Sequence, residues 1–407
     1  MMHWNEAGED KSARWRSEND TPAPKKVIIA DDRITADAAY RLACEGTALL
    51  WRGDFQNARQ LLQAMTRRAN QKPKKNKKIA ASANGQARFP HLNPLPLAGE
   101  EANVSLRELQ AKEAFHLHRQ AQSQRARTLG MLLLPFNADH SIPLRRAPDA
   151  HQACAEAYGT TTEPYIASLR GLLGLIGAHE WRKNGVEVPA LNARIHPHYG
   201  VFAPIRGEYV GLVNDAPLPE LTDVRSVAFD IGTGSGVLAA VLARRGIKHI
   251  VATDQDERAL ACARENLTRL GLNAQVDVMQ ADLFPEGRAA LIVCNPPWVP
   301  ARPSSPLEYA VFDPDSRMLL GFLNGLAAHL ETGGEGWLIL SDLAEHLGLR
   351  TRAELLAAIA AAGLQVMEKI DVKPHHPRAS DTSDPLHAAR AAELTSLWRL
   401  TAKTTGQ

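Results

Sequence analysis

The sequence predicts an α/β protein: a seven-stranded, mostly parallel sheet with helices on both faces, preceded by a mainly helical amino-terminal region. Three observations carry this prediction. Strand and helix patterns alternate from about residue 188 onwards, which is typical of a parallel sheet with helical crossovers. A glycine-rich turn joins a strand to a helix within residues 227–246. The chain before these patterns shows mostly helical spacing of its apolar residues.

The bulk composition limits the kind of protein. The chain has 407 residues, of which 44% are hydrophobic and 23% charged, as in a soluble globular protein of two or three domains. The net charge of +2 gives no global basic field of the kind that by itself indicates nucleic-acid binding. The four cysteines form no CxxC pair, which argues against a zinc ribbon or a disulfide framework and fits a reducing cytosol. We therefore expect a cytoplasmic protein with no metal, and no membrane span because no apolar run approaches the ~20 residues required.

Within about the first hundred residues, we expect one helical segment with a polar stretch on each side. Residues 1–26 are polar and charged and are predicted to be a disordered tail. Residues 27–69 form a predicted helical segment in which Asp54 is the N-cap of the second helix. Residues 70–105 are predicted to be a disordered linker or insertion because they are rich in Pro, Gly, Asn and Ala. The lysine run within residues 67–78 could contact phosphates, but a solvated tract is the preferred interpretation.

The remaining chain divides into two predicted domains. Residues 106–190 should form a mainly helical accessory domain with one strand at 131–136, and residues 191–403 should form the α/β domain. Apolar runs predict strands at 226–230, 249–254, 274–279, 289–295, 336–341, 364–372 and 394–400. Helical spacing predicts helices at 235–246, 256–271, 314–330 and 351–363. Strands that alternate with helices in this way predict a largely parallel sheet.

The glycine turn has an unusual spacing. Its glycines are Gly232, Gly234 and Gly236, and Asp230 precedes them, so the pattern is DxGxGxG. The dinucleotide fingerprint GxGxxG would need a glycine at position 237, where this chain has Val237. No Lys-Ser or Lys-Thr pair follows the glycines, which argues against a phosphate-binding P-loop. The turn therefore favours neither a nicotinamide or flavin enzyme nor an NTPase.

A carboxylate before a glycine turn favours a ligand that carries an ammonium group. S-adenosylmethionine has such a group at its methionine end, and glycines let the backbone approach the ligand closely. The alternative is that Asp230 and the glycines form an ordinary strand-to-helix turn. We prefer the cofactor interpretation because further acidic residues follow at the ends of the next strands.

Two later positions fit the rest of this cofactor. Asp254 ends the next predicted strand, where a carboxylate can accept hydrogen bonds from both ribose hydroxyls. Asp282 follows the third strand and can accept from the adenine amino group, while Leu283 can pack on the ring. We interpret Asp256 as a helix cap instead. The predicted cofactor-binding residues are Asp230, Gly232, Thr233, Gly234, Gly236, Asp254, Gln255, Asp282, Leu283 and Asn295.

Together these residues resemble the class I S-adenosylmethionine-dependent methyltransferases. The resemblance runs from about residue 193 to residue 400, roughly half of the chain, and includes DIGTGSG, Asp254, Asp282 and NPPW in that order. It implies a Rossmann-like sheet, S-adenosylmethionine as the cofactor, and residues 191–403 as the catalytic domain. It makes residues 106–190 the candidate substrate-recognition domain.

The segment IVCNPPW, which ends at Trp298, resembles the [N/D]PP[Y/F/W] signature of methyltransferases that act on nitrogen. This resemblance implies that the Asn295 side-chain oxygen and the Pro296 carbonyl each accept an N–H of the target nitrogen. Pro297 keeps the turn rigid, and Trp298 offers a flat face for stacking. The target in such enzymes is a conjugated nitrogen, either an exocyclic amine of a nucleobase or a glutamine amide. The structural alternative is a stiff turn with Trp298 in the core.

The segments before the glycine turn and after NPPW give information about the class of substrate. Residues 193–213 resemble the segment before the glycine turn in the glutamine methyltransferases of translation release factors (the HemK/PrmC group) and in small-domain rRNA guanine methyltransferases. This likeness implies that Tyr199, Phe202 and Arg206 lie near the cofactor, although a strand and turn packed on the sheet would explain them equally well. The Glu-Pro pair that follows NPPW in the release-factor enzymes has no match here.

We therefore prefer an N-methyltransferase that acts on a nucleobase in RNA or DNA, with RNA as the expected partner. The alternative is a protein-glutamine methyltransferase that acts on a translation factor. A third hypothesis is an inactive scaffold that binds the cofactor, against which the intact glycine turn and NPPW argue. The sequence predicts no oligomeric state.

Overall fold

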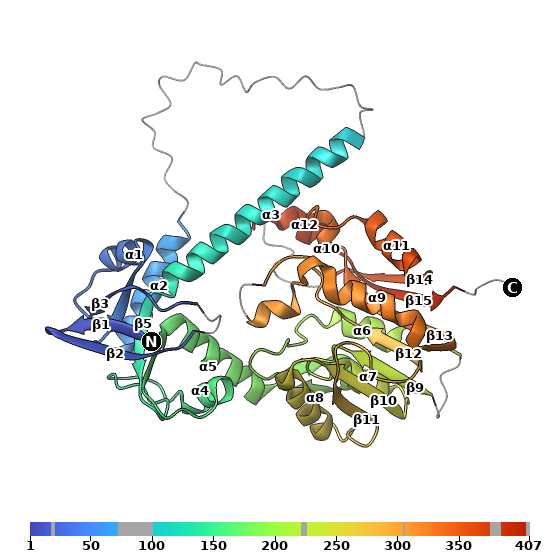
Figure 1. Cartoon of the computed structure of the whole chain (residues 1–407), viewed down its shortest axis with the longest axis horizontal. Coiled ribbons are helices and arrows are strands. Elements are labelled where there is room, and N and C mark those ends of the chain that lie inside the picture. The colour runs from blue at the N-terminus through green and yellow to red at the C-terminus, as the bar shows by residue number, and fades with distance from the viewer. Residues whose placement is uncertain (18–20, 72–100, 221–225, 304–305, 375–383, 404–407) are drawn as a thin grey trace, which may run out of the picture.

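The computed structural model describes residues 1–17, 21–71, 101–220, 226–303, 306–374 and 384–403. These residues form two large sheets, one in each half of the chain, with helices packed around them (Figure 1). A six-stranded sheet occupies the amino-terminal half and a seven-stranded sheet the carboxyl-terminal half. Within these ranges, no helix is both long and apolar enough to cross a membrane.

The amino-terminal half was predicted to be mainly helical, and this prediction is wrong. Its six strands lie in the order β1-β2-β6-β5-β4-β3. Their bounds are β1 Met2–Glu6, β2 Glu9–Trp15, β3 Lys26–Ala30, β4 Thr47–Trp51, β5 Leu132–Phe136 and β6 Tyr165–Ser168. Only β5 was predicted as a strand, and it is confirmed. Helices α1 (Ala36–Cys44), α2 (Phe55–Ala69), α4 (His151–Tyr158) and α5 (Leu169–Asn184) accompany the sheet.

Two errors in the sequence-based prediction account for most of the difference between the predicted and the observed amino-terminal half. Residues 1–26 were predicted to be a disordered tail, but β1 and β2 pair there as an antiparallel hairpin. Ala7 and Gly8 form the turn with φ values of 56° and 86°, the left-handed backbone that a two-residue hairpin requires. The strands lie at the edge of the sheet and carry mostly polar residues, so their composition resembles that of a tail. Strand β4 is buried at all five positions, and such an apolar run cannot be distinguished from a buried helix by its spacing.

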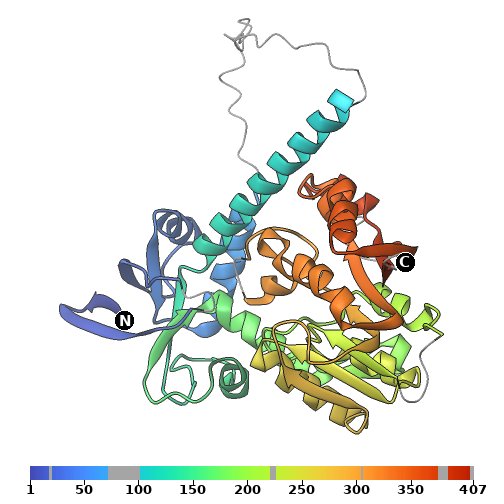
Figure 2. The same ribbon diagram turned by 45° about the vertical axis from the view of Figure 1, so that its right-hand side comes forward.

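Other amino-terminal predictions had mixed outcomes. Asp54 is the N-cap of α2, as expected, and its side chain accepts from the Gln56 amide at 2.8 Å. Most of the predicted linker 70–105 and of the lysine run lies outside the described residues. The structure resumes with α3 (Glu101–Leu129), a long helix that extends from the amino-terminal half past the segment that follows β12 (Figure 2).

The carboxyl-terminal half confirms the predicted seven-stranded, mostly parallel sheet. Its strands lie in the order β11-β10-β9-β12-β13-β15-β14, and only β15 runs antiparallel to its neighbours. Their bounds are β9 Val227–Ile231, β10 His249–Asp254, β11 Val276–Gln280, β12 Ala289–Cys294, β13 Leu330–Ser341, β14 Leu364–Val372 and β15 Thr395–Ala402. A short hairpin of β7 (Val186–Val188) and β8 (Ala193–Ile195) precedes the sheet.

Helices cover both faces of this sheet, because alternate residues of its central strands point to opposite sides. On β12, Leu291 and Val293 pack with α6 (Glu208–Asp215), α7 (Val237–Arg244) and α8 (Glu257–Arg269). Ile292 and Cys294 pack on the other side with α9 (Arg317–His329) and α11 (Arg352–Ala361). The fold is completed by α10 (Leu343–His346), α12 (His387–Ala392) and the 3-10 turns Pro189–Leu191, Pro306–Ala310 and Pro314–Ser316.

Helix α3 connects the amino-terminal half with the half that holds the seven-stranded sheet. Phe115 is buried against Val299, Leu347 and Leu386 of the carboxyl-terminal half. Arg119 forms an ion pair with Glu308 at 3.0 Å and donates to the Arg302 carbonyl at 2.7 Å. These contacts fix α3 on the segment that follows NPPW.

Helix α5 makes a second connection. Arg182 of α5 pairs with Glu265 of α8 at 2.8 Å, and His198 contacts the same carboxylate at 2.7 Å. These contacts also join the two halves, and the cavity described next lies between residues of both.

Candidate active site

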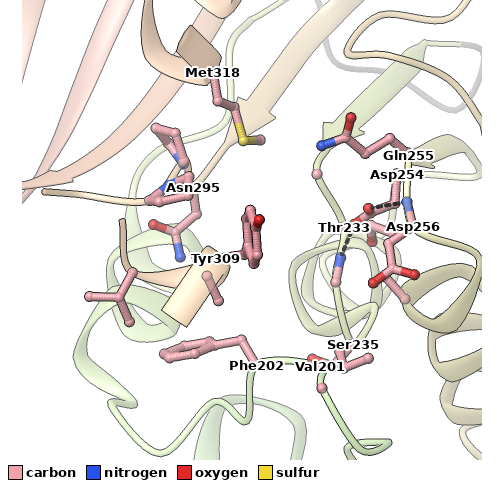
Figure 3. A pocket seen from close by; sticks show the side chains of 18 of the residues that line it. Val201, Phe202, Thr233, Ser235, Asp254, Gln255, Asp256, Asn295, Tyr309 and Met318 are labelled. Atoms are coloured by element: carbon pink, nitrogen blue, oxygen red, sulfur yellow. Dashed lines mark hydrogen bonds between the residues drawn. The ribbon is translucent and has the colours of Figure 1, made fainter. Parts of the chain in front are cut away.

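A cavity of 1370 Å³ lies beyond the carboxyl ends of β9, β10 and β12. The strand order reverses at β9, and ligands of open α/β sheets bind at such a switch point. Its walls come from the glycine turn, the ends of the neighbouring strands, the segment 199–206 and a few residues of the amino-terminal half. Figure 3 shows Asn295 on one side of the cavity and Thr233, Asp254 and Gln255 on the other.

The glycine turn presents bare backbone to this cavity. Gly232 and Gly234 line the wall with φ values of 71° and 55°, so both need the left-handed conformation that glycine adopts readily. The turn is fixed from behind, because the Thr233 amide donates to the Thr253 carbonyl at 2.8 Å. Gly236 does not line the cavity. A Cβ there would lie 3.2 Å from Cα of Ala263, so this glycine allows α7 to pack on α8.

Asp230 also lies behind the wall, which differs from the expected contact between its carboxylate and the ligand. Its side chain is 1% exposed and accepts from Thr233 Oγ1 at 2.6 Å and from the Ala239 amide at 3.0 Å. Burial raises the pKa of this carboxyl from 3.8 to about 6. Asp230 therefore holds the glycine turn against the start of α7 and does not face the cavity.

Asp254 lies where the sequence predicts a ribose-binding carboxylate. It lines the cavity at the end of β10, and its two oxygens accept from the amides of Gly234 and Asp256, each at 3.0 Å. Burial raises its pKa as well. Gln255 lies beside it on the same wall (Figure 3). Asp256 caps α8, as predicted, through the Arg258 amide at 2.9 Å, and it also lines the cavity, which the sequence analysis missed.

The two residues predicted to hold the adenine, Asp282 and Leu283, both line the cavity. Leu283 lines the cavity, and Thr253 Oγ1 fixes its backbone by donating to its carbonyl at 2.6 Å. Asp282 lines it too, but its carboxylate is well exposed and forms an ion pair with Arg317 at 2.8 Å. Met318 adds an apolar side chain between the walls (Figure 3).

The turn after β12 forms the opposite wall, and Asn295, Pro296, Pro297 and Trp298 all line the cavity. The Trp298 indole Nε1 donates to Asn295 Oδ1 at 2.8 Å. The Arg206 guanidinium lies 4.9 Å from the centre of the Trp298 ring and is itself paired with Glu208 and Glu393. Trp298 is partly buried against the sheet core and the residues around Val299, as the structural interpretation expects in part, and it also lines the cavity.

The structure brings the predicted substrate residues to the same cavity. Tyr199, Phe202 and Arg206 all line it. The sequence analysis missed Tyr309, whose ring is 66% exposed and lies between Asn295 and the glycine turn (Figure 3). It also missed Arg16 and Tyr158, which come from the amino-terminal half. No sequence signal marks these two, because only the three-dimensional contact of the halves brings them here.

The residues of the cavity fit S-adenosylmethionine. The bare backbone at Gly234 leaves room for close approach, Asp254 supplies an acceptor for hydroxyls, and Leu283 and Met318 supply apolar surface for a ring. The volume also exceeds what one such molecule occupies, since ligand pockets of ~300–1,000 Å³ hold drug-sized molecules.

Comparison with known proteins agrees with this geometry. The methyltransferase small domain family matches residues 198–352. A putative protein N5-glutamine methyltransferase of Methanocaldococcus jannaschii is 30% identical over 168 residues, which are 39% of this chain and 80% of that protein. The chain belongs to the class I S-adenosylmethionine-dependent methyltransferases.

Two further relatives of this methyltransferase differ in how much they share with it. The release factor glutamine methyltransferase of Cereibacter sphaeroides is 32% identical over 181 residues, 41% of this chain and 62% of that protein. A ribosomal protein L11 methyltransferase of Pelotomaculum thermopropionicum is 46% identical over 69 residues, but these are only 16% of this chain and 22% of that protein. The methyltransferase thus spans less than two thirds of the length of the Cereibacter relative, and the family match begins at residue 198.

Proposed function

We propose that this methyltransferase transfers a methyl group from S-adenosylmethionine to the side-chain amide nitrogen of a glutamine in a protein, with a translation factor as the substrate. The position of Asn295 carries the proposal: its amide lies on the cavity wall opposite the glycine turn. The Cereibacter and Methanocaldococcus relatives are both named as glutamine methyltransferases, which favours an amide over a nucleobase.

The turn after β12 suits a flat amide. Asn295 Oδ1 receives the indole hydrogen bond, and a carbonyl oxygen has a second lone pair that can accept an N–H of the target amide. Trp298 and Tyr309 also line the cavity, and their rings offer flat faces for a planar group. Because the indole holds Asn295 in one orientation, little reorganisation is needed when the target nitrogen becomes tetrahedral.

The cofactor supplies an already activated methyl group on its sulfonium, so the protein's task is to position the nitrogen and exclude water. The expected positions of the residues follow from the walls of the cavity. Asp254 orients the ribose, the glycine turn approaches the methionine end, and Asn295 with the Pro296 carbonyl holds the acceptor nitrogen. Asp230 acts from behind by keeping the glycine turn in place.

The sequence analysis preferred a nucleobase in RNA, and two observations favour its alternative. The named relatives give no support to RNA modification. The arginines next to the predicted acceptor site are already neutralised: Arg206 pairs with Glu208 and Glu393, and Arg317 pairs with Asp282. Phosphate binding needs cations without acidic partners, so this part of the cavity is poorly suited to bind a nucleic-acid backbone.

The test is methyl transfer from tritiated S-adenosylmethionine to purified release factors, ribosomal subunits and total RNA in parallel. We expect label in a release factor, and mass spectrometry of its peptides should locate the methyl group on a glutamine amide. Label found only in RNA would overturn the protein substrate and restore the nucleobase. A heat-treated sample of each substrate without the enzyme is the control.

A further inference from the structure

One end of the cavity is formed jointly by the two halves of the chain. Arg16, at the end of β2, and Tyr158, at the end of α4, line it from the amino-terminal half. Tyr199 and Arg258 line it from the other side. Tyr199 packs into the core of the amino-terminal half, which places all of these side chains at the junction of the halves.

Arg16 is fixed on aromatic rings but has no hydrogen-bond partner for its Nε. The guanidinium carbon lies 5.0 Å from the ring centre of Tyr158 and 5.2 Å from that of Tyr165. Tyr165 is itself buried and stacked on Phe136 at 4.7 Å, so the platform is rigid. The Arg16 Nε is buried without a partner, and a buried donor left unpaired is costly.

Arg258 approaches the same end from α8. Its guanidinium lies 6.0 Å from the Tyr199 ring centre, and its Nη1 lies 3.4 Å from where a Cβ on Gly200 would stand. Neither Arg16 nor Arg258 takes part in an ion pair with a carboxylate of the described chain. Other arginines of the cavity do: Arg206, Arg317 and Arg390 each have an acidic partner. Two cations without acidic partners at one end of a cavity indicate a site for an anion.

We propose that Arg16 and Arg258 form a carboxylate-binding subsite at the junction of the two halves. A guanidinium fork binds a carboxylate through two parallel hydrogen bonds, and rings beneath it preserve its orientation. Two molecules can supply this carboxylate: the methionine end of the cofactor, or an acidic side chain of the protein substrate. Only the second source rests on the proposed function.

The first arm of the test measures cofactor binding by calorimetry. S-adenosylhomocysteine carries the carboxylate, and methylthioadenosine lacks the whole amino acid. If the cofactor supplies the carboxylate, Arg16→Gln and Arg258→Gln should each weaken S-adenosylhomocysteine about tenfold and leave methylthioadenosine unchanged. Arg14→Gln is the matched control, because Arg14 is exposed on the same strand and does not line the cavity.

The second arm measures the anisotropy of fluorescein-labelled hexaglutamate with the S-adenosylhomocysteine-bound protein. If an acidic side chain supplies the carboxylate, both Gln variants should bind hexaglutamate about tenfold more weakly and S-adenosylhomocysteine normally. Arg16→Lys keeps the charge and should retain more affinity than Arg16→Gln in whichever arm responds. Arg258 is exposed, so Arg258→Gln keeps the test valid even if Arg16→Gln unfolds.

The subsite is overturned if both ligands bind the Gln variants as tightly as the wild type. It is also overturned if only a labelled RNA oligonucleotide binds more weakly, because the anion would then be a phosphate. Neither arm requires methyl transfer. A lack of turnover on release factors would therefore overturn the proposed function and leave this result intact.

Discussion

Trp298 and Asn295 act as a pair at the residue scale, because the indole nitrogen donates to the amide oxygen. Trp298→Phe keeps an aromatic ring and removes the donor, so Asn295 becomes free to rotate. We expect the single-turnover rate to fall about fivefold to tenfold, the value of one hydrogen bond, with unchanged affinity for S-adenosylhomocysteine. Trp181→Phe is the control, because Trp181 is an exposed tryptophan of α5. A rate equal to that of the wild type would show that the hydrogen bond has no positioning role.

A substitution at Gly232 tests whether the glycine turn takes part in cofactor binding. Its φ of 71° strains any other residue by ~1–2 kcal/mol, and a Cβ there would meet Cε of Met318. Gly232→Ala should therefore weaken S-adenosylhomocysteine binding at least tenfold in calorimetry. Gly211→Ala is the matched control, because a Cβ at Gly211 of α6 meets nothing within 4 Å. Unaltered affinity of Gly232→Ala would separate this turn from the cofactor.

The raised pKa of Asp230 predicts that the free energy of unfolding depends on pH. Burial raises the pKa of its carboxyl from 3.8 to about 6, so folding favours the protonated form. This contribution to the free energy of unfolding is fully present below about pH 4 and is lost as the pH rises through about 6. The loss amounts to roughly 3 kcal/mol.

Urea unfolding at a series of pH values measures this pH dependence of the free energy of unfolding. Asp230→Asn has no carboxyl to ionise, so its stability relative to the wild type should improve between about pH 4 and pH 7. Asp277→Asn, on the exposed side of β11, serves as the control. Parallel stability curves for the wild type and Asp230→Asn would contradict the raised pKa.

At the scale of elements, the two sheets differed in how far the sequence could predict them. Strands β9 and β12 were predictable because they are buried almost throughout and lie in the middle of the sheet. The first sheet was not predictable: β1 at its edge and the neighbouring β2 are polar, and β4 and β6 are short apolar runs next to helices. Local sequence carries the spacing of a helix or strand, but not the pairing of strands that lie far apart in the chain.

The same limit applies to the candidate site. Asp254, Leu283 and Asn295 were predictable because each follows directly on a strand or turn with a recognisable pattern. Gly236 and Asp230 were assigned to the ligand on the same pattern, but they act behind the wall. Arg16 enters the cavity from a segment about two hundred residues away, and no spacing rule connects such positions.

We expect Arg119 of helix α3 to position the segment that carries Tyr309. Its guanidinium pairs with Glu308, donates to the Arg302 carbonyl and stacks on the Phe312 ring at 4.1 Å. Arg119→Ala should loosen the segment that carries Tyr309 and raise the rate of limited chymotrypsin cleavage after Tyr309 roughly tenfold. Glu308→Arg combined with Arg119→Glu should restore part of the protection.

Arg127→Ala is the control for this helix, because Arg127 is exposed in its last turn. Hydrogen exchange over residues 299–312 gives a second readout that does not depend on activity. Equal cleavage of the wild type and Arg119→Ala would mean that α3 lies beside this segment without holding it.

At the scale of the whole molecule, the two halves enclose one cavity between two connections. Helix α3 holds the segment after NPPW, and Arg182 with His198 holds α5 against α8. The cofactor residues and Asn295 thus face each other across a space to which the amino-terminal half also contributes. In the proposed function, this cavity orients an amide nitrogen through Asn295.

The most direct test is the single-turnover rate of methyl transfer to a release factor by Asn295→Ala, with affinity for S-adenosylhomocysteine measured on the same sample. Asn273→Ala, at an exposed asparagine, is the control. Loss of a positioned acceptor at a reacting centre costs about 10²–10³ in rate, so Asn295→Ala should slow transfer by that factor and bind S-adenosylhomocysteine normally. An Asn295→Ala variant that transfers methyl groups at the wild-type rate would contradict the account.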